Sequence, residues 1–205
     1  MKLLLLLAVG LDLAWTQQDQ SQVPVQQGFS PDQVTGSWKT LNLASTNRSV
    51  IEEGGAYRCF MPSIVHLNNG NLNITYFHRK DGKCVKEYIV AEKTDIPGRY
   101  TFEYQGKNYL TFVAVTKDYV IMDYENQCEG NPFVVVELHG RTLLSGKLGL
   151  VAYLKHTARR GIGPGNIEDV SLNRKPPFLQ LLLCGSPATV AMMTVTPMEI
   201  KGVVG

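Results

Sequence analysis

The chain lacks the residue patterns that mark zinc proteins, nucleic-acid-binding proteins and membrane-spanning proteins. It has 4 cysteines and 4 histidines, without a C-x-x-C or H-x-x-H spacing, so we expect no metal site. The formal net charge is only +2, and no basic stripe indicates a nucleic-acid partner. Beyond residue 16, no apolar run is long enough to cross a bilayer, so we expect no stable membrane insertion. No motif predicts a cofactor.

Residues 1–16 are typical of a secretory signal peptide. Lys2 supplies the positive start, residues 3–9 form the apolar core, and Ala14-Trp15-Thr16 is a small-x-small cleavage site. We therefore expect a secreted, extracellular chain that starts near Gln17. Residues 17–28 are polar and rich in glutamine, which predicts a flexible arm. The remainder fits one domain with its own core.

In a secreted chain, the cysteines and two of the asparagines predict covalent modifications. Four cysteines in a secreted chain predict disulfide bonds, and the three full pairings they allow stay open. The four are Cys59, Cys84, Cys128 and Cys184. Asn47-Arg-Ser49 and Asn73-Ile-Thr75 are acceptor triplets for N-glycosylation, so we expect a glycoprotein with Asn47 and Asn73 facing solvent.

Short β-strand patterns separated by turn signals fill the first two thirds of the mature chain. They cover residues 38–45, 56–65, 72–79, 84–92, 99–104, 109–115, 119–124 and 133–140. Asn68-Asn69-Gly70-Asn71 is a hairpin turn signal, and Pro62 predicts a bend or bulge in the second strand. The spacing favours an antiparallel meander closed into a barrel. A sandwich stays open, because spacing alone does not show closure.

The pattern changes after residue 140. Apolar residues recur at helical spacing over 144–160, with Ser145 as candidate N-cap and Gly161 at the stop. Residues 166–170 predict one last short strand. The segment 174–205 carries charge at only four positions and has no clear period, so we expect an atypical apolar tail.

Several motifs together resemble the lipocalin family over residues 29–173. They are Gly36-Ser37-Trp38, Thr116-Lys-Asp118-Tyr119, Leu138-His-Gly-Arg141 and Gly161-Ile-Gly-Pro-Gly-Asn166-Ile. The chain is most similar to secreted odorant- and pheromone-binding members, and residues 43–58 are especially similar to major urinary proteins.

The resemblance implies an all-β fold, an eight-stranded antiparallel up-and-down barrel with one C-terminal α-helix packed outside. It also implies transport of a small hydrophobic molecule in the barrel (an odorant, pheromone, retinoid or fatty acid), without enzymatic activity. Trp38 and Arg141 would stack at the closed end, after the turn at Gly36. Cys84 would pair with a cysteine shortly after residues 166–169, but Pro176 stands at that place and the nearest cysteine is Cys184. A cell-surface receptor is a further expected partner.

Alternation along the strands, beside the family pattern, gives the side chains expected to face the ligand. They are Tyr57, Cys59, Met61, Ile64, Ile74, Tyr76, Ile89, Phe102, Tyr104, Leu110, Ile121, Val135 and His139. The alternative is that they fill a solid core. The same register turns Asp123, Glu125 and Glu137 inward, where they are too polar for an apolar pocket. Either they lie at the mouth or bind a ligand hydroxyl, or the register is wrong by one residue.

Cys59 supports a second hypothesis. An inward cysteine on the second strand resembles lipocalin-type prostaglandin D synthase, which implies an isomerase whose thiolate attacks an endoperoxide oxygen. The other interpretations are a buried small side chain or a disulfide with Cys128. A protein-interaction module that uses the barrel mouth is a third class.

Overall fold

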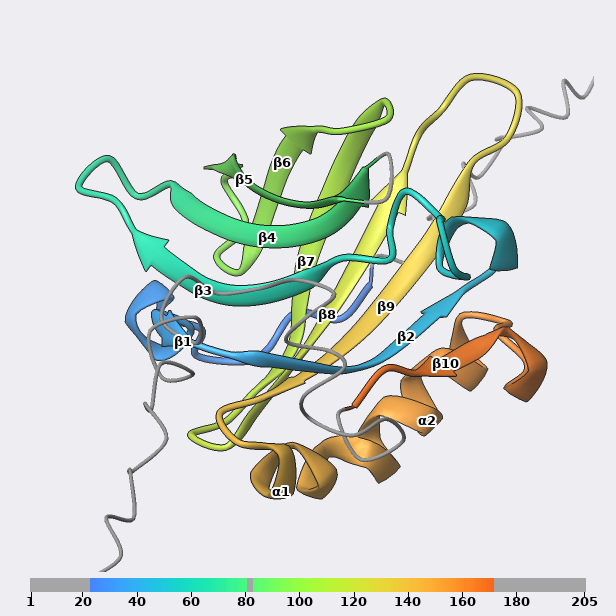
Figure 1. The fold of residues 1–205 in the computed structure, drawn as a ribbon. Helices are drawn as coiled ribbons and strands as arrows, with labels where there is room; N and C mark the ends of the chain where they lie inside the picture. Colours follow the sequence, from blue (N-terminus) through green and yellow to red (C-terminus); the bar gives the residue numbers. More distant parts are fainter. Residues whose placement is uncertain (1–22, 81–82, 172–205) are drawn as a thin grey trace, which may run out of the picture.

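The computed structural model describes residues 23–80 and 83–171, with the backbone alone at residues 79 and 80. The predicted leader, Cys184 and the tail over 174–205 lie outside the described residues. Within them, one antiparallel sheet curls into a barrel, and a helical segment packs against its outside (Figure 1). The predicted all-β barrel with one C-terminal helix is confirmed, and the sandwich alternative is wrong.

Each predicted strand forms, and the first is divided in two at Trp38. The strands are β1 (Gly36–Ser37), β2 (Lys39–Ser45), β3 (Phe60–His66), β4 (Leu72–Lys80), β5 (Lys83–Lys93), β6 (Arg99–Glu103), β7 (Lys107–Val115), β8 (Tyr119–Asn126), β9 (Phe133–Gly140) and β10 (Ile167–Asp169). The last is the short strand expected near residues 166–170. Short 3-10 turns lie at Pro31–Gln33, Arg48–Val50 and Pro164–Asn166.

The first strand closes the barrel. β1 pairs with β3 and β2 pairs with β9, so the two halves of this strand join opposite ends of the meander. Between them, the N–H of Trp38 donates to the carbonyl of Pro62 at 2.9 Å. The β3–β4 register shifts between Phe60 and Ser63, which confirms the bulge expected at Pro62. Closure leaves a protected interior between the strands.

The closed end of the barrel is built around Trp38, which is only 3% exposed. Its indole N–H donates to the carbonyl of Val34 at 2.7 Å, and the guanidinium of Arg141 lies 3.6 Å from the ring centroid. Gly36 has a φ of +110°, and a Cβ there would lie 3.0 Å from Arg141 Nη1. Glycine therefore allows both the turn and the close approach of the cation.

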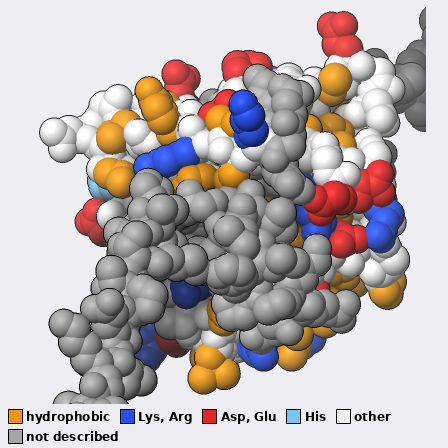
Figure 2. Space-filling model, viewed as in Figure 1, with side chains coloured by type: hydrophobic (Ala, Val, Ile, Leu, Met, Phe, Trp, Pro, Cys, Tyr) orange, Lys and Arg blue, Asp and Glu red, His pale blue; other side chains and the backbone are white. Residues whose placement is uncertain are grey.

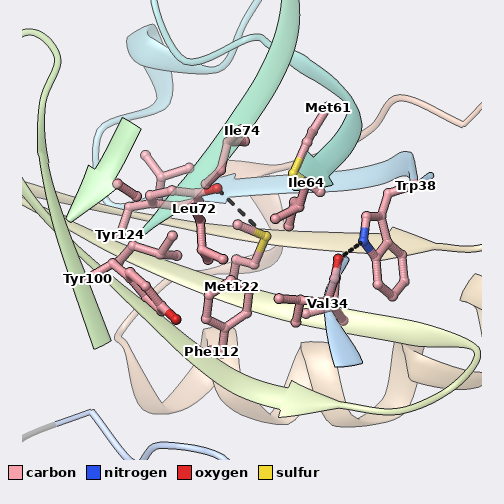
Figure 3. Close-up of a cluster of buried hydrophobic side chains, with 14 of the residues drawn as sticks. Val34, Trp38, Met61, Ile64, Leu72, Ile74, Tyr100, Phe112, Met122 and Tyr124 are labelled. Atoms are coloured by element: carbon pink, nitrogen blue, oxygen red, sulfur yellow. Dashed lines mark hydrogen bonds between the residues drawn. The ribbon is translucent and has the colours of Figure 1, made fainter. Parts of the chain in front are cut away.

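The sheet separates two hydrophobic clusters. The inner cluster fills the barrel from Trp38 toward Tyr100 and Tyr124 (Figure 3). The outer cluster lies between the sheet and the helical segment, and its buried members are Leu41, Ala44, Ile121, Val136, Leu138, Tyr153 and Ile162. Strands β8 and β9 therefore contribute apolar side chains to both faces.

The helical segment comprises α1 (Leu143–Gly146), the 3-10 turn Lys147–Gly149 and α2 (Leu150–Arg159). Its N-cap is Thr142, whose side chain accepts from the N–H of Ser145, so the expected cap at Ser145 is wrong by one turn. Gly161 follows the helix with a φ of +71°, as expected of a stop. Tyr153 anchors α2 to β9, because its buried hydroxyl donates to the carbonyl of Val136 at 3.1 Å.

The part of the predicted arm that the structure describes lies against the sheet. The N–H of Gln26 donates to the carbonyl of Phe112 at 2.8 Å, and its side-chain oxygen accepts from the N–H of Val115 at 3.0 Å. Val23 is buried. Gln26 thus attaches this segment to β7, and the carbonyl of Val23 accepts from Arg99 on β6 at 3.1 Å.

Candidate functional site

The barrel interior contains a cavity of about 50 Å³. Its lining residues are Tyr57, Cys59, Met61, Ile74, Tyr76, Ile89, Phe102, Tyr104, Tyr124 and Glu137. Measured in this way, one water needs about 10–15 Å³ of cavity volume, although its share of the volume of liquid water is about 30 Å³. The cavity therefore has room for roughly four waters. That corresponds to a molecule the size of one small aromatic ring.

The structure brings eight of the thirteen predicted ligand-facing residues together around this cavity. They are Tyr57, Cys59, Met61, Ile74, Tyr76, Ile89, Phe102 and Tyr104. Ile64, Leu110 and Val135 are buried in the inner cluster without lining the cavity. His139 is buried next to the lining residue Glu137.

Ile121 lies on the other side of the sheet, so its predicted inward position is wrong. It packs with Tyr153 in the outer cluster, while Val120 and Met122 belong to the inner cluster. The register expected for this strand is therefore shifted by one residue, and Tyr124 takes the cavity position instead.

Two of these eight residues, Tyr57 and Cys59, reach the cavity from the loop before β3. Tyr57 and Cys59 were expected on the second strand, but that strand begins at Phe60. Tyr57 is held in place by its hydroxyl, which donates to Asn108 Oδ1 at 2.7 Å. Tyr104 holds the same loop, because its hydroxyl donates to the carbonyl of Ala56 at 2.6 Å.

The cavity wall is mainly aromatic. The ring of Tyr104 lies edge-on to those of Tyr57 and Tyr76, with centroids 5.2 and 5.9 Å away. Phe102 and Tyr124 form another edge-on pair at 6.0 Å. Such pairs stabilise one another and give the wall fixed ring positions.

Glu137 is the one charged side chain that the structure places in the wall among the residues it describes, and it is 6% exposed. Its Oε2 accepts from the hydroxyl of Tyr124 at 3.0 Å and lies 2.9 Å from Nε2 of His139. Burial and then the charge of Glu137 raise the pKa of Tyr124 well above its ordinary value, so this hydroxyl stays protonated and donates. The sequence pattern had turned Glu137 inward, but its polarity kept it out of the predicted pocket.

Asp123 and Glu125 occupy the opposite face of the sheet, under α2. Asp123 Oδ2 lies 2.6 Å from Nε2 of His156 and 3.0 Å from Nε of Arg160. Arg160 also donates to Glu125 at 2.8 Å. These carboxylates therefore dock the helix instead of facing the cavity.

Cys59 does not have the environment of a nucleophilic thiol. Burial, and after it the charge of Glu137, raise its pKa to about 12, while a reactive cysteine needs a lowered pKa. Its Sγ donates to the carbonyl of Ala56 at 3.3 Å. Cys59 and Cys128 are both free, so a disulfide between them is wrong. The pairing of Cys84 with Cys184 stays a prediction, since Cys184 lies outside the described residues.

The other predicted sites lie at the surface of the barrel. Asn47 is half-buried at the start of the turn Arg48–Val50, where its Oδ1 accepts from the N–H of Ser49. Asn73 is half-buried on β4. Glycosylation at both stays a prediction. Among residues 23–80 and 83–171, no group of three histidine, cysteine or acidic side chains is arranged to hold a metal ion.

The closed barrel, the Trp38–Arg141 end and the helix packed outside define a lipocalin fold. The sequence model of the Lipocalin / cytosolic fatty-acid binding protein family matches residues 35–171, and the chain belongs to this family.

The chain is similar to lipocalins named for saliva, the epididymis and milk whey. A salivary lipocalin from Sus scrofa is 35% identical over 69% of this chain and 74% of its own length. Epididymal-specific lipocalin-9 from Mus musculus is 34% identical over 83% of this chain and 96% of its own. The solved structure of the possum milk whey lipocalin trichosurin, with bound 4-ethylphenol, has a TM-score of 0.60 and 31% identity. The match covers 66% of this chain and 95% of the trichosurin chain.

The described surface is mixed in character. On the face shown in Figure 2, acidic, basic and apolar side chains are interspersed. None of the helices in the described part of the chain has the length and apolar character needed to cross a membrane.

Proposed function

We propose that this lipocalin is a secreted carrier that binds one small hydrophobic molecule inside its barrel. The observation that carries the proposal is the cavity itself, which lies inside a closed sheet and is lined mainly by aromatic and aliphatic side chains. The signal-peptide pattern supports secretion, as do relatives named for saliva and the epididymis. The bound 4-ethylphenol named for trichosurin supports a ligand of one ring.

The cavity size sets the expected affinity. A one-ring ligand that buries about 200 Å² of apolar surface gains about 5 kcal/mol at about 25 cal/mol/Å². Ordering costs reduce this gain to about 4 kcal/mol, so a purely apolar ligand should bind with a Kd of roughly 1 mM. Tighter binding then requires a polar contact in addition to burial.

The test is calorimetric titration of the purified chain with toluene, together with two variants on adjacent residues of β5. Ile89 lines the cavity, so Ile89→Trp should fill it and abolish binding. Val90 is 42% exposed, so Val90→Trp should leave binding unchanged. Saturable one-to-one binding that only Ile89→Trp removes would support the proposal. A folded wild-type chain that binds no one-ring apolar compound would overturn it.

Secretion is tested separately. Expression of the full chain in a mammalian cell line should release protein whose N-terminus lies near Gln17, as determined by N-terminal sequencing. Retention of the unprocessed chain inside the cell would contradict this part of the proposal.

A further inference from the structure

The cavity wall combines aromatic rings with a single buried carboxylate. Four tyrosines and Phe102 lie around Glu137, and within residues 23–80 and 83–171 no lysine or arginine lines this space. Aromatic faces attract cations, and they do so more strongly where water is excluded. A purely apolar ligand would make no use of the carboxylate.

The wall tyrosines direct their hydroxyls to other partners. Tyr57 donates to Asn108, Tyr104 to the carbonyl of Ala56 and Tyr76 to Glu87 Oε2, at 2.7, 2.6 and 2.9 Å. Tyr124 donates to Glu137 itself. Because these hydroxyls are already bonded, the rings supply mainly their carbon surfaces to the cavity.

Glu137 retains an acceptor for a ligand. Both of its hydrogen-bond contacts, with Tyr124 and His139, are made by Oε2. Among the described residues, no hydrogen bond reaches Oε1, although the residue is more than nine-tenths buried. Oε1 is not among the fully enclosed atoms that lack a partner, and Glu137 lines the cavity, so a donor placed in the cavity could bond to this oxygen.

In its neutral form, the neighbouring histidine supplies no positive charge to Glu137. Nδ1 of His139 is buried without a hydrogen-bond partner in the described structure, so an imidazolium would leave one N–H unsatisfied. A neutral ring that donates from Nε2 avoids this. The charge of Glu137 also raises the pKa of Cys59 on the facing loop, consistent with a negative cavity.

We propose that the ligand is a small primary amine, bound as its ammonium cation with one N–H donated to Glu137 Oε1 and its apolar part enclosed by the wall rings. This inference rests on the proposed carrier function and names the chemical class of the ligand. The ammonium group makes a charge-assisted hydrogen bond and lies beside aromatic faces, two contacts that a neutral analogue lacks. The size of the cavity limits the amine to about one ring.

The test uses three probes of nearly equal size: benzylamine, benzyl alcohol and toluene. Calorimetric titration at pH 7 should show benzylamine binding at least about tenfold more tightly than either neutral probe. Glu137→Gln keeps the shape and removes the charge, so it should weaken benzylamine at least about tenfold and change toluene binding less than about threefold. Glu103→Gln removes an exposed carboxylate on β6, and it should leave all three affinities unchanged.

The outcomes separate the two proposals. If benzyl alcohol binds wild type as tightly as benzylamine, Glu137 recognises a neutral hydroxyl and the amine inference is wrong, while the carrier function stands. If none of the three probes binds, the carrier function itself fails. The comparison of probes on wild type needs no variant, so it remains decisive even if Glu137→Gln does not fold.

Discussion

Two carboxylate–histidine pairs lie on opposite faces of β8 and β9, and only the outer pair includes an arginine. Under the helix, Asp123 contacts both His156 and Arg160, at 2.6 and 3.0 Å. Inside the barrel, Glu137 contacts His139 at 2.9 Å, and no arginine or lysine joins it in the described structure. Both carboxylates are buried. The outer one has a permanent cation and the inner one does not.

The difference separates a structural contact from a binding contact. A buried carboxylate that is paired with a cation from another element fixes that element in place, and the outer pair does this for α2. A buried carboxylate without a cation carries an electrostatic cost in the empty protein, which a cationic ligand would relieve. The arginine, and not the histidine, therefore distinguishes the two roles.

The largest effect should follow from removing the outer charge. Asp123→Asn leaves buried His156 and mostly buried Arg160 without their shared carboxylate, so the free energy of unfolding should fall by about 3 kcal/mol. Urea unfolding followed by circular dichroism measures this loss. Glu103→Gln is the control and should change stability by less than about 0.5 kcal/mol. A loss below about 1 kcal/mol for Asp123→Asn would mean that the outer pair does not hold the helix.

Most of the barrel could be predicted from the sequence, because turn signals and alternation repeat along it. The error at Ile121 has a physical cause. Val120, Ile121 and Met122 are all buried, because β8 has the barrel interior on one face and the helix on the other. A strand that is apolar on both faces does not alternate, so its sequence does not decide the register.

The site was harder to predict than the fold. Tyr57 and Cys59 reach the cavity from a loop, where alternation gives no rule. Glu137 was on the correct face but did not match an apolar pocket. Its unpaired oxygen depends on which atom Tyr124 and His139 contact, and only the three-dimensional arrangement contains that information.

Cys59 gives a chemical measure of the negative charge in the cavity. Its pKa rises from 9.0 to about 12 through burial first and Glu137 second. At pH 8 this lowers the thiolate fraction about a thousandfold, and the higher nucleophilicity of a more basic thiolate offsets about thirtyfold of that. Iodoacetamide should therefore alkylate Cys59 about thirtyfold more slowly in the native chain than in urea.

Variants of the two carboxylates make this measurement specific. Glu137→Gln should speed alkylation of Cys59 in the folded protein, because it removes the second cause of the raised pKa. Asp123→Asn, on the far face of the sheet, should not, provided that the variant is assayed where it is folded. Peptide mass spectrometry resolves Cys59 from exposed Cys128. Equal rates in all three native proteins would show that the charge of Glu137 does not reach the thiol.

The smallest expected change in stability, that of Glu137→Gln, tests most directly whether the two buried carboxylates differ. Glu137→Gln should change the free energy of unfolding by less than about 1 kcal/mol, in contrast to Asp123→Asn. The amide oxygen still accepts from Tyr124, so the weaker hydrogen bonds are offset by the loss of an uncompensated buried charge. Urea unfolding without ligand measures the change. If this variant instead loses about 3 kcal/mol, then His139 carries a proton and neutralises Glu137 as Arg160 helps to neutralise Asp123. The two faces would then be equivalent, and the cavity would have no charge left for an amine.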